Sequence, residues 1–376
     1  MPVQPTRTSR ARKRPGPAPG RLREIERSLR ELEMGEGSGD VELGDERLRV
    51  TNLAKVYFPD SGITKGAVMR YYTRIWPVLQ GHVDGRPLVL KRYPDGIDGQ
   101  IFYQQNAGAH VPRGVRVEKV ETAGEGAQSR IVGGDLLTLL YTVQLGAVEV
   151  HPWLSRIGTI DTPDECLIDL DPADDVPFSR VVLLARHILS MAAECSLPMA
   201  VKTSGSSGLH LVVPLPRATS YETSARLALL LASATATQWP ALATVERSIR
   251  KRPAGTIYVD AMQNARGKSM AGAYSLRPRP LATASTPISP RELTSRLSTE
   301  RFTIKTVPAR VMRKGDVWEA ALATRASTRA LTDAITALAR VLEDTSATTL
   351  PPRHAKRRPA GGAGVASAAK RQSRRN

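Results

Sequence analysis

The sequence predicts an α+β fold built from one or two small mixed β-sheets with helices packed against them. Apolar residues at helical spacing are interleaved with short apolar runs that indicate strands. Two of these strands flank a short Gly/Ser turn, which is typical of a hairpin. At 376 residues the chain suits two domains, or one large composite domain with tails.

The first half begins with an amphipathic helix expected over residues 21–34. Leu22, Ile25, Leu29 and Leu32 form one apolar stripe, with acid–base pairs elsewhere on the helix. The stretch "GEGSGD" then ends the helix and begins a linker. A strand is expected at 47–53, a helix opening at Thr64 over 64–79, strands at 86–94 and 99–105, a buried helix at 133–146 and a strand at 147–155.

The second half repeats this mixture of helices and strands. Strands are expected at 165–172, 198–205, 208–215 and 255–264, helices at 178–196 and 220–240, and a helical C-terminal cover at 316–343. We therefore divide the chain into a basic arm (1–20), an amphipathic helix with linker (21–45), one folded domain (46–345) and a basic tail (346–376).

The net charge of +18 is concentrated at the two ends of the chain. Residues 1–20 hold five Lys/Arg and residues 351–376 hold eight, and neither segment contains an acid. Both are rich in Pro, Gly, Ala and Arg, so we expect them to be disordered. Such arms suit a polyanion, because Lys and Arg that neutralise phosphates release counterions. The alternative is a solubilising role.

The sequence excludes two classes of protein. It has no run of about 18 apolar residues and no apolar N-terminal segment, so we expect a cytoplasmic, nucleoid-associated protein without a membrane partner. Cys166 and Cys195 lie in apolar surroundings and match no zinc spacing, which excludes a cysteine-rich zinc site.

The stretch "ECLIDLDPAD" places two carboxylates in an apolar run that indicates a buried strand. In an extended strand Asp169 and Asp171 point to one face, while Ile168 and Leu170 point to the other. Asp260 ends a second apolar strand. Three such acids would raise one another's pKa unless a dication joined them, and oxygen ligands suit Mg²⁺ or Mn²⁺. The alternative is that each acid caps a strand end or pairs with an arginine.

Two other phosphate chemistries fit this chain less well. Phosphatases with a D-x-D nucleophile prefer Thr or Val where this chain has Ala173, and "SGSSGLH" lacks the Gly-Lys-Ser/Thr ending of a P-loop. The turn from Ser204 to Gly208 still offers backbone amides and hydroxyls to an anion, and His210 follows it. The alternative is an ordinary hairpin turn.

The chain carries nine motifs in a fixed order: "TNLAKVYFP", "ITKGAVMRYY", "LVLKRYPDG", "IFYQQNAG", "AVEVHPWLSR", "CLIDLDP", "VKTSGSSGLHLVVPL", "IYVDAMQN" and "GKSMAGAYSLRPRPLATASTPI". In this order they resemble the primase-polymerase domain of the bacterial end-joining ligase D, a branch of the archaeo-eukaryotic primase superfamily. The resemblance covers about residues 46–320, and without a ligase or nuclease domain the chain looks like a stand-alone member. It implies a primase-type fold in which two mixed β-sheet modules, flanked by helices, form a central nucleotide and nucleic-acid cleft.

The resemblance implies a template-directed nucleotidyltransferase acting at DNA ends or gaps, with terminal-transferase and ribonucleotide-adding tendencies. It implies two Mg²⁺ or Mn²⁺ ions on Asp169, Asp171 and Asp260, which would activate the primer hydroxyl and hold the triphosphate. The expected partners are nucleoside triphosphates, DNA gaps with a 5′-phosphate, a separate ligase and an end-binding protein.

The resemblance also implies roles for further residues. Nucleotide or primer contacts are implied for Ser204, His210, His151, Lys91, Arg277, Gln263, Asn264 and Lys268. Lys55 and Lys65 match a pair that recognises the downstream 5′-phosphate, a task that suits lysine as a point charge. Phe102 and Tyr103 match an aromatic pair that stacks on template bases, although a lone Phe-Tyr is more often core.

Two positions depart from the family pattern. Many relatives carry a lysine where the Ser/Gly turn has Ser207, and a basic residue where this chain has Gln105. We therefore expect an active enzyme, and we expect these two departures to affect its affinity for nucleotides. Two rival hypotheses are a primase that needs no primer and an idle module that bridges DNA ends through Lys55, Lys65 and the basic arms.

Overall fold

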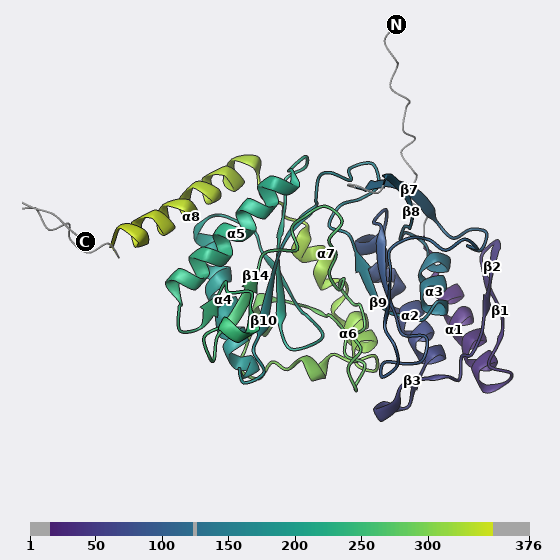
Figure 1. Cartoon of the computed structure of the whole chain (residues 1–376). Coiled ribbons are helices and arrows are strands. Elements are labelled where there is room, and N and C mark those ends of the chain that lie inside the picture. The colour runs from purple at the N-terminus through teal and green to yellow at the C-terminus, as the bar shows by residue number, and fades with distance from the viewer. Residues whose placement is uncertain (1–15, 123–125, 349–376) are drawn as a thin grey trace, which may run out of the picture.

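The structure, a computed structural model, describes residues 16–122 and 126–348 and contains two sheet-centred modules side by side (Figure 1). The expected α+β class is confirmed. Most of the basic arm and nearly all of the basic tail lie outside the described residues. No helix in the part of the chain that the structure describes is long and apolar enough to cross a membrane.

The larger module is built on a six-stranded mixed sheet. Its strands follow the order β13 (Ala243–Thr244), β14 (Ile257–Asp260), β10 (Glu165–Pro172), β12 (Leu209–Pro214), β11 (Ala200–Thr203) and β15 (Pro287–Ile288). All neighbours are antiparallel except the parallel pair β13–β14. Helices α4 (Phe178–Glu194) and α5 (Tyr221–Gln238) pack on the sheet, and α8 (Thr328–Thr348) packs on α5.

The smaller module contains a three-stranded antiparallel sheet in the order β6 (Phe102–Gln104), β5 (Leu88–Arg92) and β9 (Ala147–Pro152). A hairpin of β7 (Val117–Thr122) and β8 (Gly126–Ile131) belongs to the same half of the chain. Helices α2 (Lys65–Val83) and α3 (Leu136–Gln144) carry the core of this module. Both expected sheets are therefore present, and only the larger one is mixed.

Helix α2 joins the two modules. It starts as predicted at Thr64, whose hydroxyl accepts a hydrogen bond from the Ala67 amide and so satisfies one free helical N–H. Tyr72 donates its buried hydroxyl to the Val148 carbonyl of β9 (2.6 Å) and accepts the Leu276 amide (3.1 Å). Tyr71 donates to the Tyr274 carbonyl at 2.7 Å. These bonds hold the segment around 274–277 against the smaller sheet.

The structure differs from the sequence expectations at several elements. The expected linker contains a strand, β1 (Gly39–Leu43), which pairs with β2 (Glu46–Val50), because Val41 faces the core opposite Leu48. Helix α1 (Pro19–Met34) is confirmed and packs on α2. The helical region 316–343 is split into α7 (Val317–Leu322) and α8. The sequence patterns missed β3 (Val56–Phe58), β4 (Ile63–Thr64), α6 (Val307–Lys314), β13, β15 and the β7–β8 hairpin.

Candidate active site

A row of polar residues crosses four strands of the larger sheet. Lys202 on β11 lies opposite His210 on β12, His210 lies opposite Asp169 on β10, and Asp169 lies opposite Asp260 on β14. Directly paired residues share one face of a sheet, and Asp171 projects to that face two positions further along β10. Strand pairing therefore brings together the three acids that the sequence singled out.

The electrostatics of this face favour a bound cation. Burial, together with the carboxylates of Asp171 and Asp260, raises the pKa of Asp169 to about 7. Such a set of oxygen donors fits Mg²⁺ or Mn²⁺. The three residues thus fit the metal site that the resemblance implies.

Two of the three carboxylates also have partners within the protein. Arg252 donates from Nη1 to Asp171 Oδ2 at 3.1 Å, and Asp260 accepts the Met262 amide (2.7 Å) and Gln263 Nε2 (3.1 Å). Within residues 16–122 and 126–348, no group of three or more His, Cys, Asp or Glu side chains is already arranged so that it could hold a metal ion. The contacts expected from the alternative interpretation, an arginine pair and a cap, are therefore present at the same acids.

The Ser/Gly turn packs tightly against the acidic strand. A Cβ atom on Gly208 would lie 2.0 Å from the Leu170 carbonyl oxygen, so only glycine allows β12 to approach β10 this closely. The Ser204 hydroxyl accepts the amides of Ser206 and Gly208, both at 3.0 Å. The proton of the Ser204 hydroxyl has no acceptor among the described residues, so the hydroxyl can donate to an anion.

A buried carboxylate, Glu149, gathers three of the cations that the resemblance implies for nucleotide binding. Glu149 is fully buried on β9 and lies 2.6 Å from His151 Nε2, 3.2 Å from Arg277 Nε and 3.9 Å from Lys91 Nζ. Burial alone would raise the pKa of Glu149, but the hydrogen bond from His151 and the three charges lower it to about 2.

Sequence reasoning missed Glu149, although a signal for it exists. Glu149 and His151 alternate in "AVEVHPW" in the same way as Asp169 and Asp171 alternate in "LIDLDP". Arg277 also donates from Nη1 to the Ser204 carbonyl at 2.8 Å. The cation cluster of the smaller module thereby touches the Ser/Gly turn of the larger one.

Aromatic side chains flank this cluster. Lys91 Nζ lies 5.7 Å from the ring centroid of Tyr93 and 5.8 Å from that of Tyr103. Tyr103 is 72% exposed and Phe102 is 43% exposed, so this pair is not core. Both rings are available as a stacking surface beside the cations.

A pocket of about 490 Å³ lies where the two modules meet. Val89, Gln105 and Arg130 line it from the smaller module, and Gln263 and Lys268 line it from the larger one. Arg130 donates from Nη1 to Gln105 Oε1 at 2.9 Å, so a cation lies beside Gln105. Arg279 likewise donates to Ser206 in the turn, next to Ser207.

The remaining predicted residues have different environments. Lys55 pairs with Asp95 at 2.7 Å and is partly exposed, whereas Lys65 is 3% exposed and donates to the carbonyls of Thr51 (2.9 Å) and Gln144 (3.0 Å). Burial, together with the charge of Lys55, lowers the pKa of Lys65 to about 8, and the Lys65 amide donates to the Lys55 carbonyl at 2.8 Å.

The expectation for Asn264 is wrong. Its side chain is 1% exposed, accepts the Leu167 amide (2.8 Å) and donates to the carbonyls of Leu167 (2.7 Å) and Ala261 (2.9 Å). The side-chain amide of Asn264 therefore bonds to the backbone of β10 in the way that the backbone of a neighbouring strand would. With these groups engaged and buried, Asn264 holds the acidic strand in place and does not face a ligand.

Comparisons with known proteins agree with this architecture. A family model described as the LigD primase-polymerase domain matches residues 64–318. The multifunctional non-homologous end joining protein LigD of Pseudomonas aeruginosa is 28% identical over 265 residues, which cover 70% of this chain and 31% of the relative. The bifunctional non-homologous end joining protein LigD of Bacillus subtilis is 30% identical over 270 residues, covering 72% of this chain and 43% of the relative.

A solved structure is similar over most of the described chain. The polymerase domain of Mycobacterium tuberculosis ligase D in complex with DNA has a TM-score of 0.69 and 28% sequence identity, and the match covers 75% of this chain and 100% of that one. The primase-type fold implied by the nine motifs is thus confirmed. The chain spans between 31% and 43% of the length of the two curated relatives described above.

Proposed function

The chain belongs to the LigD primase-polymerase domain family, a family of metal-dependent, DNA-directed nucleotidyltransferases, and from this premise we propose that it adds nucleotides to a primer terminus at DNA ends or gaps. The observation that carries the proposal is the cross-strand pairing of Asp169 with Asp260, with Asp171 on the same face. In an antiparallel sheet this register places three carboxylates next to one another and next to the Ser/Gly turn.

Asp169, Asp171 and Asp260 would hold two Mg²⁺ or Mn²⁺ ions. When bound, such ions lower the pKa of a hydroxyl nucleophile and neutralise developing charge on a phosphate. The chain's own part is to keep the three carboxylates aligned on one face of the sheet. Gln263 supports this by donating to Asp260, and Asn264 supports it by anchoring β10 at Leu167.

The cation cluster and the turn would bind the triphosphate. Lys91, His151 and Arg277 already converge on Glu149, so little side-chain entropy remains to be lost when a nucleotide binds. The Ser204 hydroxyl and His210 complete the phosphate contacts from the larger sheet. Arg279 and Arg130 would supply the charge that Ser207 and Gln105 do not, so the loss of nucleotide affinity expected from these two positions is offset.

The DNA would be held at two places. Lys65, at the N-terminus of α2, and Lys55, whose carbonyl accepts the Lys65 amide, would recognise a 5′-phosphate across a gap, assisted by the helix dipole. Phe102 and Tyr103 would stack on template bases, and the pocket lined by Gln263 and Lys268 would receive the primer terminus.

Since the relatives are named for non-homologous end joining, we assign this chain to the same repair process, with a separate ligase and an end-binding protein as partners.

Primer extension tests the proposal. The full-length protein is incubated with Mn²⁺, labelled ribo- or deoxyribonucleotides and a recessed primer on a 5′-phosphorylated gap. We expect extension by the wild type, its loss in Asp169→Asn, Asp171→Asn and Asp260→Asn, and unchanged DNA binding in all three. Asp175→Asn, an exposed aspartate just after β10, is the matched control and should extend normally.

Two other outcomes would overturn the proposal. Dinucleotide synthesis on a bare single-stranded template, without primer extension, would indicate a primase. Retained end binding without any incorporation by the wild type would indicate a module that only bridges DNA ends.

A further inference from the structure

Lys202 is a buried cation without a carboxylate partner, and it lies beside His210 in the row of residues that crosses the larger sheet. It is 4% exposed, and among the described residues no Asp or Glu oxygen lies within 4.0 Å of its ammonium group. Burying an unpaired charge costs several kcal/mol, roughly, so stability alone does not explain a lysine here. Its contacts indicate what the charge does.

The three protons of the Lys202 ammonium have three acceptors. Nζ lies 2.8 Å from the Ala271 carbonyl, 2.7 Å from Ser285 Oγ and 2.5 Å from His210 Nδ1. The Ser285 hydroxyl donates its own proton to the Thr203 carbonyl at 2.8 Å, so toward Lys202 it can only accept. A carbonyl also only accepts. The third ammonium proton therefore points at His210 Nδ1.

This arrangement decides which nitrogen of His210 carries a proton. A ring nitrogen that accepts a hydrogen bond has no proton, so Nδ1 is bare and, in a neutral ring, Nε2 is protonated. A ring whose Nδ1 accepts the Lys202 proton carries a single proton, on Nε2, and is therefore neutral. Nε2 lies 3.4 Å from Asp169 Oδ1, on the catalytic face.

We propose that Lys202, as an ammonium group, is a positioning residue that locks His210 in the tautomer with a protonated Nε2, so that His210 presents a donor to the catalytic face. With the other tautomer, the lone pair of Nε2 would face carboxylate and phosphate oxygens and repel them. The tautomer itself is a property of the folded protein. The consequence for nucleotide binding rests on the proposed function.

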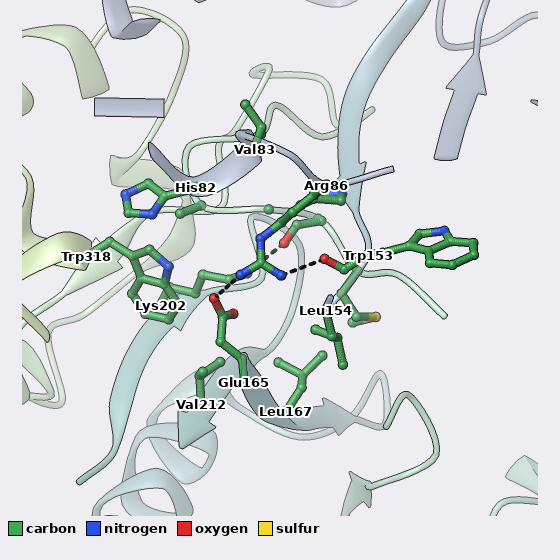
Figure 2. A pocket seen from close by; sticks show the side chains of 15 residues that line it. His82, Val83, Arg86, Trp153, Leu154, Glu165, Leu167, Lys202, Val212 and Trp318 are labelled. Carbon is green, nitrogen blue, oxygen red and sulfur yellow. Dashed lines mark hydrogen bonds and ion pairs between the residues drawn. The ribbon is translucent and has the colours of Figure 1, made fainter. Parts of the chain in front are cut away.

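The surroundings of Lys202 support this role. A cavity of about 40 Å³ lies beside its side chain, lined also by Arg86 and Glu165. Figure 2 shows Arg86 held between the carbonyl of Trp153 and the carboxylate of Glu165, which leaves Glu165 engaged with Arg86 instead of Lys202. The pKa of Lys202 is lowered to about 7 by burial and by Arg277, while Asp169 and Glu165 oppose the shift. The ammonium form therefore prevails at pH 6.

The first test is spectroscopic and needs no activity. In ¹⁵N-histidine-labelled full-length protein at pH 6, without metal or nucleotide, the ¹⁵N shifts of His210 distinguish its two tautomers, and His210→Gln identifies its signals among the six histidines. We expect the Nε2-protonated tautomer in the wild type and a mixture in Lys202→Met. Ser285→Ala, which removes a different acceptor of Lys202, should keep the wild-type tautomer.

If Lys202→Met fails to fold, a second variant, Lys202→Arg, still tests the proposal. The adjacent cavity has space for a guanidinium, which still donates to Nδ1, so this variant should retain the wild-type tautomer. An Nδ1-protonated His210 in the wild type, or an unchanged tautomer in folded Lys202→Met, would overturn the proposal.

The second test is kinetic and uses primer extension. Lys202→Met should raise the nucleotide KM about tenfold, as expected for loss of one hydrogen bond to a charged group, and leave kcat nearly unchanged. In a His210→Gln background, where the amide N–H₂ at the same place donates regardless of Lys202, the same substitution should raise KM less than about twofold. Equal effects in both backgrounds would show that Lys202 acts in another way. Absence of all extension, with the tautomer as expected, would count against the proposed function only.

Discussion

Arg252 Nη1 lies 3.1 Å from Asp171 Oδ2 and stacks its guanidinium 4.4 Å from the ring centroid of Tyr258, the residue paired with Asp171 across β14. The arginine thus occupies a carboxylate that the proposed function assigns to a metal ion. A cation of the protein and a divalent ion compete for the same oxygen atom.

Arg252→Gln should therefore strengthen Mn²⁺ binding to the DNA-free protein. Asp171 is about half exposed, so the pair is worth at most about 1 kcal/mol and the gain should not exceed about fivefold. Titration of free Mn²⁺ by electron paramagnetic resonance measures it. Arg250→Gln, an exposed neighbour without a carboxylate partner among the described residues, is the control. Equal affinities in Arg252→Gln and the wild type would show that the arginine does not compete.

Glu149 should make stability depend on pH under acidic conditions. Its folded pKa is about 2, below the ordinary value of 4.5, so its stabilisation is present above pH 4.5 and is lost as the pH falls toward 2. The groups that face it are His151, Arg277, Lys91 and the hydroxyls of Tyr72 and Tyr93. Between pH 6 and pH 3 the wild type should lose about 2 kcal/mol that Glu149→Gln does not lose.

Urea unfolding of both proteins at pH 3, 4, 5 and 6 measures this difference. The other acids titrate in both proteins, so their contribution cancels in the comparison. Parallel pH profiles would show that the Glu149 carboxylate is not held by the cation cluster.

Replacement of Lys55 should affect DNA binding alone, whereas replacement of Lys65 should also affect the stability of the protein. Lys55→Ala should weaken binding to a 5′-phosphorylated gap and leave binding to an unphosphorylated gap nearly unchanged, because Lys55 is partly exposed. Lys65→Ala should show the same selectivity and also lower the melting temperature, since two backbone carbonyls lose their donor. Fluorescence anisotropy on the two gaps measures the ratio, with Lys305→Ala as an exposed control. An equal loss on both gaps would contradict the phosphate assignment.

Arg279→Ala should raise the nucleotide KM severalfold without changing DNA affinity. Arg279 is exposed and donates to Ser206, in the turn that the proposed function assigns to the triphosphate. Arg296→Ala, another exposed arginine of the same module, should leave KM unchanged. If the two variants behave alike in primer extension, the charge near Ser207 is not used for the triphosphate.

Tyr103→Ala should weaken binding to a primer with a single-stranded template overhang. Stacking of one base on an aromatic ring contributes about 1–3 kcal/mol, and Tyr103 is exposed enough to be removed without harm to folding. The same variant should bind a blunt duplex like the wild type. Comparison of the two dissociation constants measures the effect, and a similar loss on the blunt duplex would exclude a stacking role.

Much of the fold could be predicted from local patterns. The stripe of Leu22, Ile25 and Leu29 predicted α1, Thr64 predicted the start of α2, and alternation in "ECLIDLDP" predicted a strand with both aspartates on one face. These features depend on residues close in sequence. The missed elements are short, such as β13 and β15 with two residues each, and exist because a neighbouring strand supplies their hydrogen bonds.

By itself, the sequence determined which chemical groups the site contains. These are acids on apolar strands, a Ser/Gly turn, and cations in a recognisable order. Only the tertiary structure decided which of them meet. The pairing of Asp169 with Asp260, the convergence of three cations on Glu149, the contact of Arg252 with Asp171 and the contact of Lys202 with His210 all join residues from different elements. The physical reason is that strand register and helix docking are set by burial over the whole chain, whereas side-chain periodicity is set within a few residues.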